Sequence, residues 1–306
     1  MWTVFIMWLV ATLLFFGLRA LPTGPVEAML GASATPESVA AMRTRLGLNR
    51  PLSVQYIDWM TDLAVLDFGR SIVSGENINK LLVRAIPKTA SISVIAIITG
   101  LVIAIPTGII SATKRGTMID HTATMIAFLG LSVPSFFIGI LFILLFSVEL
   151  GLFPTFGYVS MTEDPVGWLK SVLLPGVAVG MPYAAITMRM LRSSLLETLN
   201  QPYMQTARAK GLNSRVQLFK HALQNASIPV VTVVGIQMGI VIISGAVAVE
   251  IVFGSRGIGR VLIESILNRD YQVTQAVILL IAGFMSIVIL GVDIVYTMLD
   301  PRIRYD

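Results

Sequence analysis

The sequence predicts an all-α integral membrane protein that crosses the bilayer with six helices. Of its 306 residues, 55% are hydrophobic and only 13% are charged, and the mean hydropathy is +0.82. These values lie outside the range of soluble domains. Several nearly uncharged windows are long enough to span the roughly 30 Å hydrocarbon layer as helix. A transmembrane barrel would show short alternating segments instead, so we expect one helical membrane domain over residues 1–306.

The apolar windows predict where each spanning helix lies. The expected helices cover residues 2–21, 88–112, 119–148, 171–198, 227–252 and 273–299. The first window is long enough to span and lacks both a basic leader and a clear cleavage site, so we expect a retained helix and not a signal peptide. Polar residues 22–87 then predict an extracytoplasmic lobe, with an amphipathic piece from Pro51 to Leu66.

The distribution of lysine and arginine predicts the orientation. Three short segments carry an excess of basic residues: Lys114 and Arg115; Arg189, Arg192, Arg208, Lys210, Arg215 and Lys220; Arg302 and Arg304. Basic residues collect in short cytoplasmic loops, and long loops such as 22–87 are exempt from this rule. We therefore expect both termini, and a segment spanning residues 199–226, on the cytoplasmic side.

Small residues and prolines within the spans predict local features of the bundle. Pro106, Pro134, Pro175 and Pro182 are expected at kinks or at the ends of spans, since each removes a backbone donor. Gly130, Gly139 and Gly180 are expected where helices approach closely.

Several classes of active site are not supported. The chain has no cysteine, its two histidines, His121 and His221, are isolated, and no Walker A pattern occurs. No metal site, nucleophile with an adjacent base, or nucleotide-hydrolysing motif is therefore predicted. The net charge of +5 is spread among loops without a long basic run, so we expect no nucleic-acid partner. The glycine-rich stretch from Gly254 to Gly259 is expected to form a structural turn.

Three acids fall within or at the ends of the apolar windows, namely Glu149, Glu250 and Asp293. An acid within a membrane usually has a polar partner or lies on an ion pathway. We expect pairing or interfacial solvation, with Arg302 within reach of Asp293. An ion-coupled secondary transporter is the alternative that these acids leave open.

The segment from Tyr203 to Leu212 is the most informative part of the chain. It is basic and compatible with a helix, and Ala207 and Gly211 are placed to share one helix face that another protein can approach. Gly211 is expected to end a first short helix and turn the chain toward a second one that begins near Ser214. With Tyr203 as an aromatic anchor and its basic residues, the segment suits an acidic partner. A generic loop whose charges only set topology is the alternative.

The order of residues in this segment resembles the coupling motif of ABC-importer permeases, in particular the first permease subunit of the dipeptide/oligopeptide branch. Further matches are distributed along the chain, among them Leu46-Gly47-Leu48-Asn49-Arg50-Pro51, Asp67-Phe68-Gly69-Arg70, Ser132-Val133-Pro134-Ser135-Phe136, Leu152-Phe153-Pro154 and Leu299-Asp300-Pro301-Arg302. The chain departs from the broad family pattern in having Gln205 in place of glutamate, Gln224 in place of proline, and Ser255-Arg256-Gly257 after Glu250 where Pro-Gly is common.

The resemblance implies site residues and partners. ATPase-coupling residues would be Tyr203, Gln205, Thr206, Ala207, Arg208, Ala209, Lys210, Gly211 and Leu212, and an outer gate would involve Glu250, Phe253, Gly257 and Gly259. It implies a second homologous permease, two cytoplasmic ATPase subunits that bind ATP and Mg, an extracytoplasmic solute-binding protein and a location in the inner or plasma membrane. The chain itself would hold no cofactor and catalyse no reaction. Peptides are the expected substrate, nickel or sugars are alternatives, and no substrate-binding residue is identified.

Overall fold

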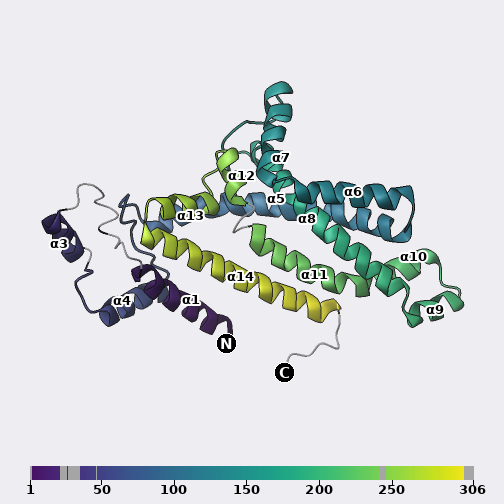
Figure 1. Cartoon of the computed structure of the whole chain (residues 1–306), viewed down its shortest axis with the longest axis horizontal. Coiled ribbons are helices and arrows are strands. Elements are labelled where there is room, and N and C mark those ends of the chain that lie inside the picture. The colour runs from purple at the N-terminus through teal and green to yellow at the C-terminus, as the bar shows by residue number, and fades with distance from the viewer. Residues whose placement is uncertain (1, 21–25, 27–34, 46, 242–245, 300–306) are drawn as a thin grey trace. The chain divides into compact units, whose positions relative to one another are not determined.

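The computed structural model describes residues 2–20, 26, 35–45, 47–241 and 246–299, which form helices joined by turns (Figure 1). Within these residues the one β-type pairing is an isolated bridge between Arg70 and Asn77. The helices are α1 (Trp2–Arg19), α3 (Pro36–Arg45), α4 (Leu52–Ala64), α5 (Ile78–Thr113), α6 (Met118–Ser132), α7 (Ser135–Phe142), η2 (Ile143–Glu149), α8 (Pro165–Leu199), α9 (Pro202–Ala209), α10 (Ser214–Val216), η3 (Gln217–Ala222), α11 (Leu223–Ile240), α12 (Ala246–Val252), α13 (Ile258–Leu267) and α14 (Tyr271–Leu299). The prediction of an all-helical membrane protein is confirmed.

Four helical segments of the described chain are long and apolar enough to cross a membrane: α5, α8, Ser214–Ile240 and Tyr271–Met298. A fifth candidate is the pair Met118–Ser132 and Ser135–Glu149, which is bent by 96° at a short break. Helix α1 is apolar but shorter, and Thr3–Arg19 is its apolar part. By length and composition, the described residues therefore contain four candidate spans, or five if the bent pair is one span.

The expected single helix over residues 119–148 is wrong. Val133 between α6 and α7 is extended, with φ −94° and ψ 123°, and Pro134 precedes the first residue of α7. A proline disfavours the helical conformation of the residue before it and removes one backbone donor. The prediction that Pro134 marks a kink or a span end is therefore confirmed, whereas Pro175 and Pro182 lie inside the unbroken helix α8.

Other boundaries differ less from the predictions. Helix α5 begins at Ile78, inside the segment expected to belong to the extracytoplasmic lobe. Helix α8 begins at Pro165, because the Asp164 carboxylate accepts a hydrogen bond from the Val166 amide at 3.0 Å and a proline suits the first helical position. The window 227–252 contains α11 and α12, and its residues 242–245 lie outside the described residues.

The contacts divide the chain into two compact units. The first comprises Met1–Pro87 and Arg256–Ser286, and the second comprises Lys88–Ser255 and Ile287–Asp306. In the first unit, α1 packs on the amphipathic helix α4: the Phe15 ring lies 5.3 Å from that of Tyr56 and 5.5 Å from that of Trp59. The Ser71 hydroxyl donates a hydrogen bond to the buried carboxylate of Asp270 in the same unit. Helix α4 matches the amphipathic piece expected from Pro51 to Leu66.

In the second unit, α8 packs against α6, α7 and α11. Close approach to α5 is possible at Gly180, because a Cβ atom there would lie 2.6 Å from the Ala96 carbonyl oxygen. At Gly139 a Cβ atom would lie 2.9 Å from the Phe253 ring, while Gly130 is in ordinary contact with α8. Gly130, Gly139 and Gly180 therefore lie at contacts between helices, as predicted. A buried apolar cluster joins α8 to α9 and α11 and connects the polar segment that follows α8 to the bundle.

Candidate functional site

The segment between α8 and α11 has the local structure that its sequence predicts. Helix α9 begins with Pro202 and ends at Ala209, and Gly211 follows with φ +72°, a conformation that side-chain-bearing residues rarely adopt. Helix α10 begins at Ser214, where the Asn213 side chain accepts a hydrogen bond from the Arg215 amide at 3.0 Å. The prediction that Gly211 ends one helix before a second one near Ser214 is confirmed.

Burial divides α9 into an inner and an outer face. Met204 is 0% exposed and Ala207 is 8% exposed, and residues three apart lie on the same face of a helix. The other predicted coupling residues are all exposed: Tyr203, Gln205, Thr206, Arg208, Ala209, Lys210, Gly211 and Leu212. The expected outer face made by Ala207 and Gly211 is therefore wrong, because Ala207 turns toward the bundle and Gly211 lies beyond the end of the helix.

The inner face attaches α9 to two long helices. Met204 belongs to a buried cluster that includes Leu191 and Leu195 of α8 and residues of η3 and α11 such as Ala222 and Ala226. An eight-residue helix is too short to be stable alone in water, so these contacts hold α9 in place. Met204 is the residue that sequence reasoning missed in this segment, although its spacing from Ala207 is an available signal.

Hydrogen bonds reinforce this attachment. The Asn225 side-chain amide donates to the Tyr203 hydroxyl oxygen at 2.8 Å, and the Arg208 guanidinium donates to the Leu199 carbonyl oxygen at 3.3 Å. The 41% exposed ring of Tyr203 is therefore tied to α11, and Arg208 is tied to the end of α8. Both bonds connect the outer face of α9 directly to membrane helices.

The outer face is cationic. Residues 199–226 contain Arg208, Lys210, Arg215 and Lys220 and no aspartate or glutamate, and all four basic residues are exposed. Such a surface is complementary to an acidic partner and repels a basic one. Within the described chain, no group of three or more His, Asp or Glu side chains is placed to hold a metal ion.

The predicted outer-gate residues do not form one described cluster. Glu250 is completely buried, and its carboxylate accepts a hydrogen bond from the Thr89 hydroxyl. Phe253 is buried in a cluster with Val249 and Leu174. Gly257 and Gly259 belong to the other compact unit, where Gly257 precedes α13 and both are buried. The chain from Gly254 to Gly259 forms a turn followed by the start of α13, as expected.

The three acids of the apolar windows have different environments. Glu250 has the polar partner that the sequence led us to expect. Glu149 is exposed at the end of η2. The expected partner of Asp293, Arg302, lies outside the described residues. Of these acids, Glu250 alone is fully buried.

An ion pair between a buried aspartate and a half-buried arginine, which the sequence did not reveal, joins three helices. Asp120 of α6 accepts hydrogen bonds from Nε and Nη2 of Arg192 in α8, both at 2.8 Å. The Ser111 hydroxyl of α5 also donates to this carboxylate, and the Gly116 amide does so at 2.9 Å. Asp120 and Arg192 are 72 residues apart in sequence, so no local spacing signals the pair.

A second polar cluster lies between membrane helices. The Thr187 hydroxyl of α8 donates to the Gln237 side-chain oxygen of α11 at 3.3 Å, while the Gln237 amide nitrogen has no hydrogen-bond partner in the part of the chain that is described. Gln237, Thr187 and Tyr183 border a void of about 20 Å³, enough for one water molecule. A buried amide of this kind is costly in an apolar environment.

Comparison with known proteins decides the family. The protein-family model described as "Binding-protein-dependent transport system inner membrane component" matches residues 104–305. A second family model, described as "Binding-prot-dependent transport system membrane comp, N-term", matches residues 1–93. The chain belongs to this family. It is therefore a permease component of a transport system and not the subunit that hydrolyses ATP.

Curated relatives of this permease component extend over nearly its whole length. It is 38% identical over 303 residues to the probable peptide ABC transporter permease protein y4tP of Sinorhizobium fredii, covering 99% of this chain and 96% of the relative. It is 37% identical to the dipeptide transport system permease protein DppB of Alkalihalophilus pseudofirmus, covering 94% and 92%. The di/tripeptide transport system permease protein DppB of Pseudomonas aeruginosa is also 37% identical, covering 96% and 94%.

A solved structure shares the fold of the permease component. The inward-facing MetNI methionine ABC transporter contains a chain that matches with a TM-score of 0.57 and 20% sequence identity. The match covers 72% of this chain and 96% of that chain. At this identity the similarity supports the fold and carries no information about substrate.

Proposed function

We propose that this chain is the transmembrane permease subunit of an ATP-driven importer for dipeptides and oligopeptides. The observation that carries the proposal is the similarity, over nearly the full length, to permeases named for peptide, dipeptide and di/tripeptide transport. The basic outer face of α9 supports the coupling role, because it is exposed on one side and attached to the bundle on the other.

The proposed topology has six spans. It counts α1, α5, the bent segment α6–η2, α8, residues 227–252 of α11 and α12, and α14 as one span each. Both termini and α9 then lie in the cytoplasm, and residues 22–87 lie outside. The support is the excess of lysine and arginine in the turn after α5, in the segment 199–226 and in the C-terminal residues.

The proposed partners are a second homologous permease, two ATPase subunits and an extracytoplasmic solute-binding protein. The ATPases would bind ATP and Mg, and this chain would bind neither. Movement of the ATPases against Gln205, Thr206, Arg208 and the adjacent exposed residues would displace α9. Because Met204 is packed against α8 and α11, the displacement would pass to these membrane helices as a rigid-body motion.

The outer-gate assignment also belongs to this proposal. Glu250 and Phe253 lie near the end of the fifth proposed span, and Gly257 and Gly259 lie at the turn that leads into α13. A gate requires a segment with two arrangements. The buried Glu250 carboxylate with its Thr89 partner gives the closed arrangement a specific polar contact.

Uptake by the reconstituted complex tests this function. This chain would be co-purified with its second permease and ATPases and placed in proteoliposomes with the solute-binding protein and a radiolabelled dipeptide. We expect uptake with ATP and none with an ATPase subunit disabled in hydrolysis. Competition by unlabelled nickel chelate or sugar, without competition by peptides, would contradict the peptide assignment. Uptake that follows a proton gradient without ATP would contradict the ATP-driven function.

A further inference from the structure

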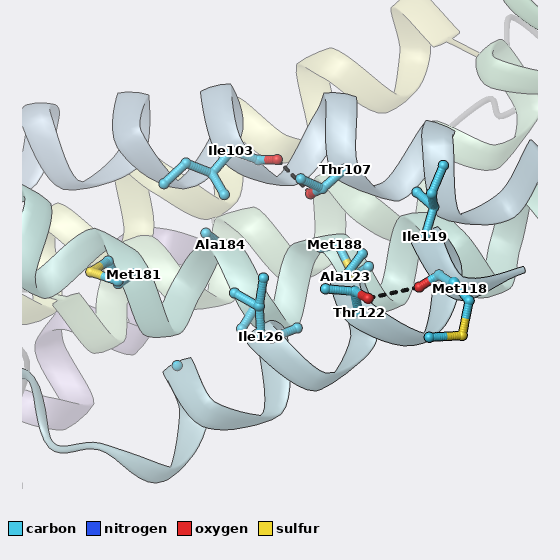
Figure 2. Close-up of a pocket in the computed structure, with 13 residues that line it drawn as sticks. Ile103, Thr107, Met118, Ile119, Thr122, Ala123, Ile126, Met181, Ala184 and Met188 are labelled. Carbon is cyan, nitrogen blue, oxygen red and sulfur yellow. Dashed lines mark hydrogen bonds between the residues drawn. The ribbon is translucent and has the colours of Figure 1, made fainter. Parts of the chain in front are cut away.

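A cavity of about 460 Å³ lies between α5, α6 and α8 in the second compact unit. Figure 2 shows Ile103 and Thr107 from α5, Thr122 and Ile126 from α6, and Ala184 and Met188 from α8 around it. The volume is within the range of roughly 300–1,000 Å³ that is common for small-molecule sites. We call this cavity the α6 groove.

The α6 groove offers a ligand no free side-chain hydrogen-bond donor among the described residues that line it. The hydrogens of its two hydroxyl groups are already used, because Thr107 donates to the Ile103 carbonyl oxygen and Thr122 donates to the Met118 carbonyl oxygen at 2.7 Å. The backbone carbonyl groups of a peptide placed there would find no side-chain donor, which is costly. The lining therefore favours a hydrocarbon ligand.

The length of the groove fits one leaflet of a bilayer. Its lining follows α6 from Met118 to Gly130, a distance of about 18 Å at the helical rise of about 1.5 Å per residue. One leaflet contributes about 15 Å to the hydrocarbon layer. An acyl chain that enters near Met118 would therefore end near Gly130 and Met181, at about the middle of the membrane.

The turn that leads into the groove-lining helix α6 carries two basic residues. Lys114 and Arg115 are exposed in the turn that immediately precedes Met118, and neither forms an ion pair within the described residues. The turn is held in place because the Gly116 amide donates to the buried carboxylate of Asp120 at 2.9 Å. Basic residues next to a membrane attract anionic lipid headgroups.

We infer that the α6 groove binds one acyl chain of an anionic phospholipid, whose phosphate lies against Lys114 and Arg115. The lipid fills the space between α6 and α8 and leaves the polar coupling segment free. A helix of the second permease is the competing occupant, but an uncharged hydrophobic helix gains no charge pairing with Lys114 and Arg115 in the turn before Met118. The charge at one end and the apolar lining along the rest together favour a phospholipid.

Photolabelling of the full transporter complex in phosphatidylcholine nanodiscs tests this inference. One sample contains phosphatidylglycerol with a photoreactive diazirine in its acyl chain, and the matched sample contains phosphatidylcholine with the same chain. We expect the charged lipid to label peptides containing Ala123, Ile126 and Met188 several times more than the neutral lipid does, and excess unlabelled phosphatidylglycerol to remove this difference. Equal labelling by both lipids, spread over all exposed apolar residues, would overturn the inference.

Substitutions separate the headgroup from the acyl chain. Replacing both cations, Lys114→Ser with Arg115→Ser, is expected to reduce labelling by the charged lipid several times, to about the level of the neutral lipid. Ala123→Leu is expected to reduce labelling by both lipids because it fills the groove. Ala90→Leu, on an exposed part of α5 outside the groove, is the matched control and should change neither.

A separate cross-linking measurement tests whether a helix of the second permease occupies the groove, and it needs no destabilising substitution. A photoreactive amino acid at Ile126, which lines the groove and is exposed, is expected to cross-link to lipid in the assembled complex. Cross-linking of this position to the second permease in place of lipid would overturn the inference.

Discussion

The attachment of α9 to the bundle depends most on Met204, and its removal has a predictable cost. The side chain is completely buried among Leu191 and Leu195 of α8 and Ala222 and Ala226 at the start of the next span. Replacing a buried methionine with alanine costs about 2–5 kcal/mol. At about 1.4 kcal/mol per factor of ten, even the lower value shifts an opening equilibrium of α9 by roughly thirtyfold.

Two measurements on Met204→Ala follow this equilibrium. Hydrogen exchange of the α9 amides should accelerate at least roughly thirtyfold if the lost free energy affects only the opening of α9. Peptide uptake per ATP hydrolysed should fall, because a detached α9 no longer moves the bundle. Met204→Leu conserves volume and should cost less than about 1.5 kcal/mol, while Gln205→Ala is exposed and should leave amide exchange unchanged. Unaltered exchange and uptake in Met204→Ala would refute the role of this contact.

Three further predictions concern other described contacts. At Gly211, a Cβ atom would meet nothing within 4 Å and φ is +72°. Gly211→Val should therefore weaken ATPase pull-down and uptake through backbone strain of about 1–2 kcal/mol, whereas Gly211→Asn should largely retain both. Equal loss in the two variants would contradict a backbone cause. Asp120→Ala should lower the free energy of unfolding by about 1–3 kcal/mol, because Arg192 loses its partner although its side chain stays 28% exposed to solvent. Adding Arg192→Met should restore part of the loss, and additive losses in a denaturation assay would refute the pairing. Gln237→Leu removes an amide nitrogen that has no partner among the described residues, but it also removes the acceptor of the Thr187 hydroxyl. The free energy of unfolding should therefore be between unchanged and about 2 kcal/mol higher. A lower melting temperature would contradict this.

Much of the fold was predictable because the governing signals are local. Apolar length predicted α5, α8 and α14, and the proline at position 134 predicted the break between α6 and α7. The position of the break was predicted correctly but its angle was not, because a proline permits anything from a slight kink to the 96° bend that is found. Helix α13 was missed because its short amphipathic sequence lies in a segment read only as a loop.

The candidate site shows the same division between local and long-range information. Gly211 and Ser214 were placed correctly, because the positions of helix ends depend on a few neighbouring residues. The orientation of Ala207 was not, because the face that α9 buries is decided by side chains of α8 and α11 that are distant in sequence. The pairing of Asp120 with Arg192 was missed for the same reason, since it exists only once three helices have packed.

The absence of cysteine from the chain permits a direct measurement of whether the exposed face of α9 meets the ATPases. Single variants Gln205→Cys and Ala209→Cys would place a benzophenone cross-linker on that face, and Ala90→Cys, on an exposed part of α5, is the control position. We expect ATPase adducts from positions 205 and 209 in the assembled complex and none from position 90. No ATPase adduct from either exposed position, together with labelling of both by a membrane-impermeant maleimide added outside intact cells, would contradict the coupling role of α9.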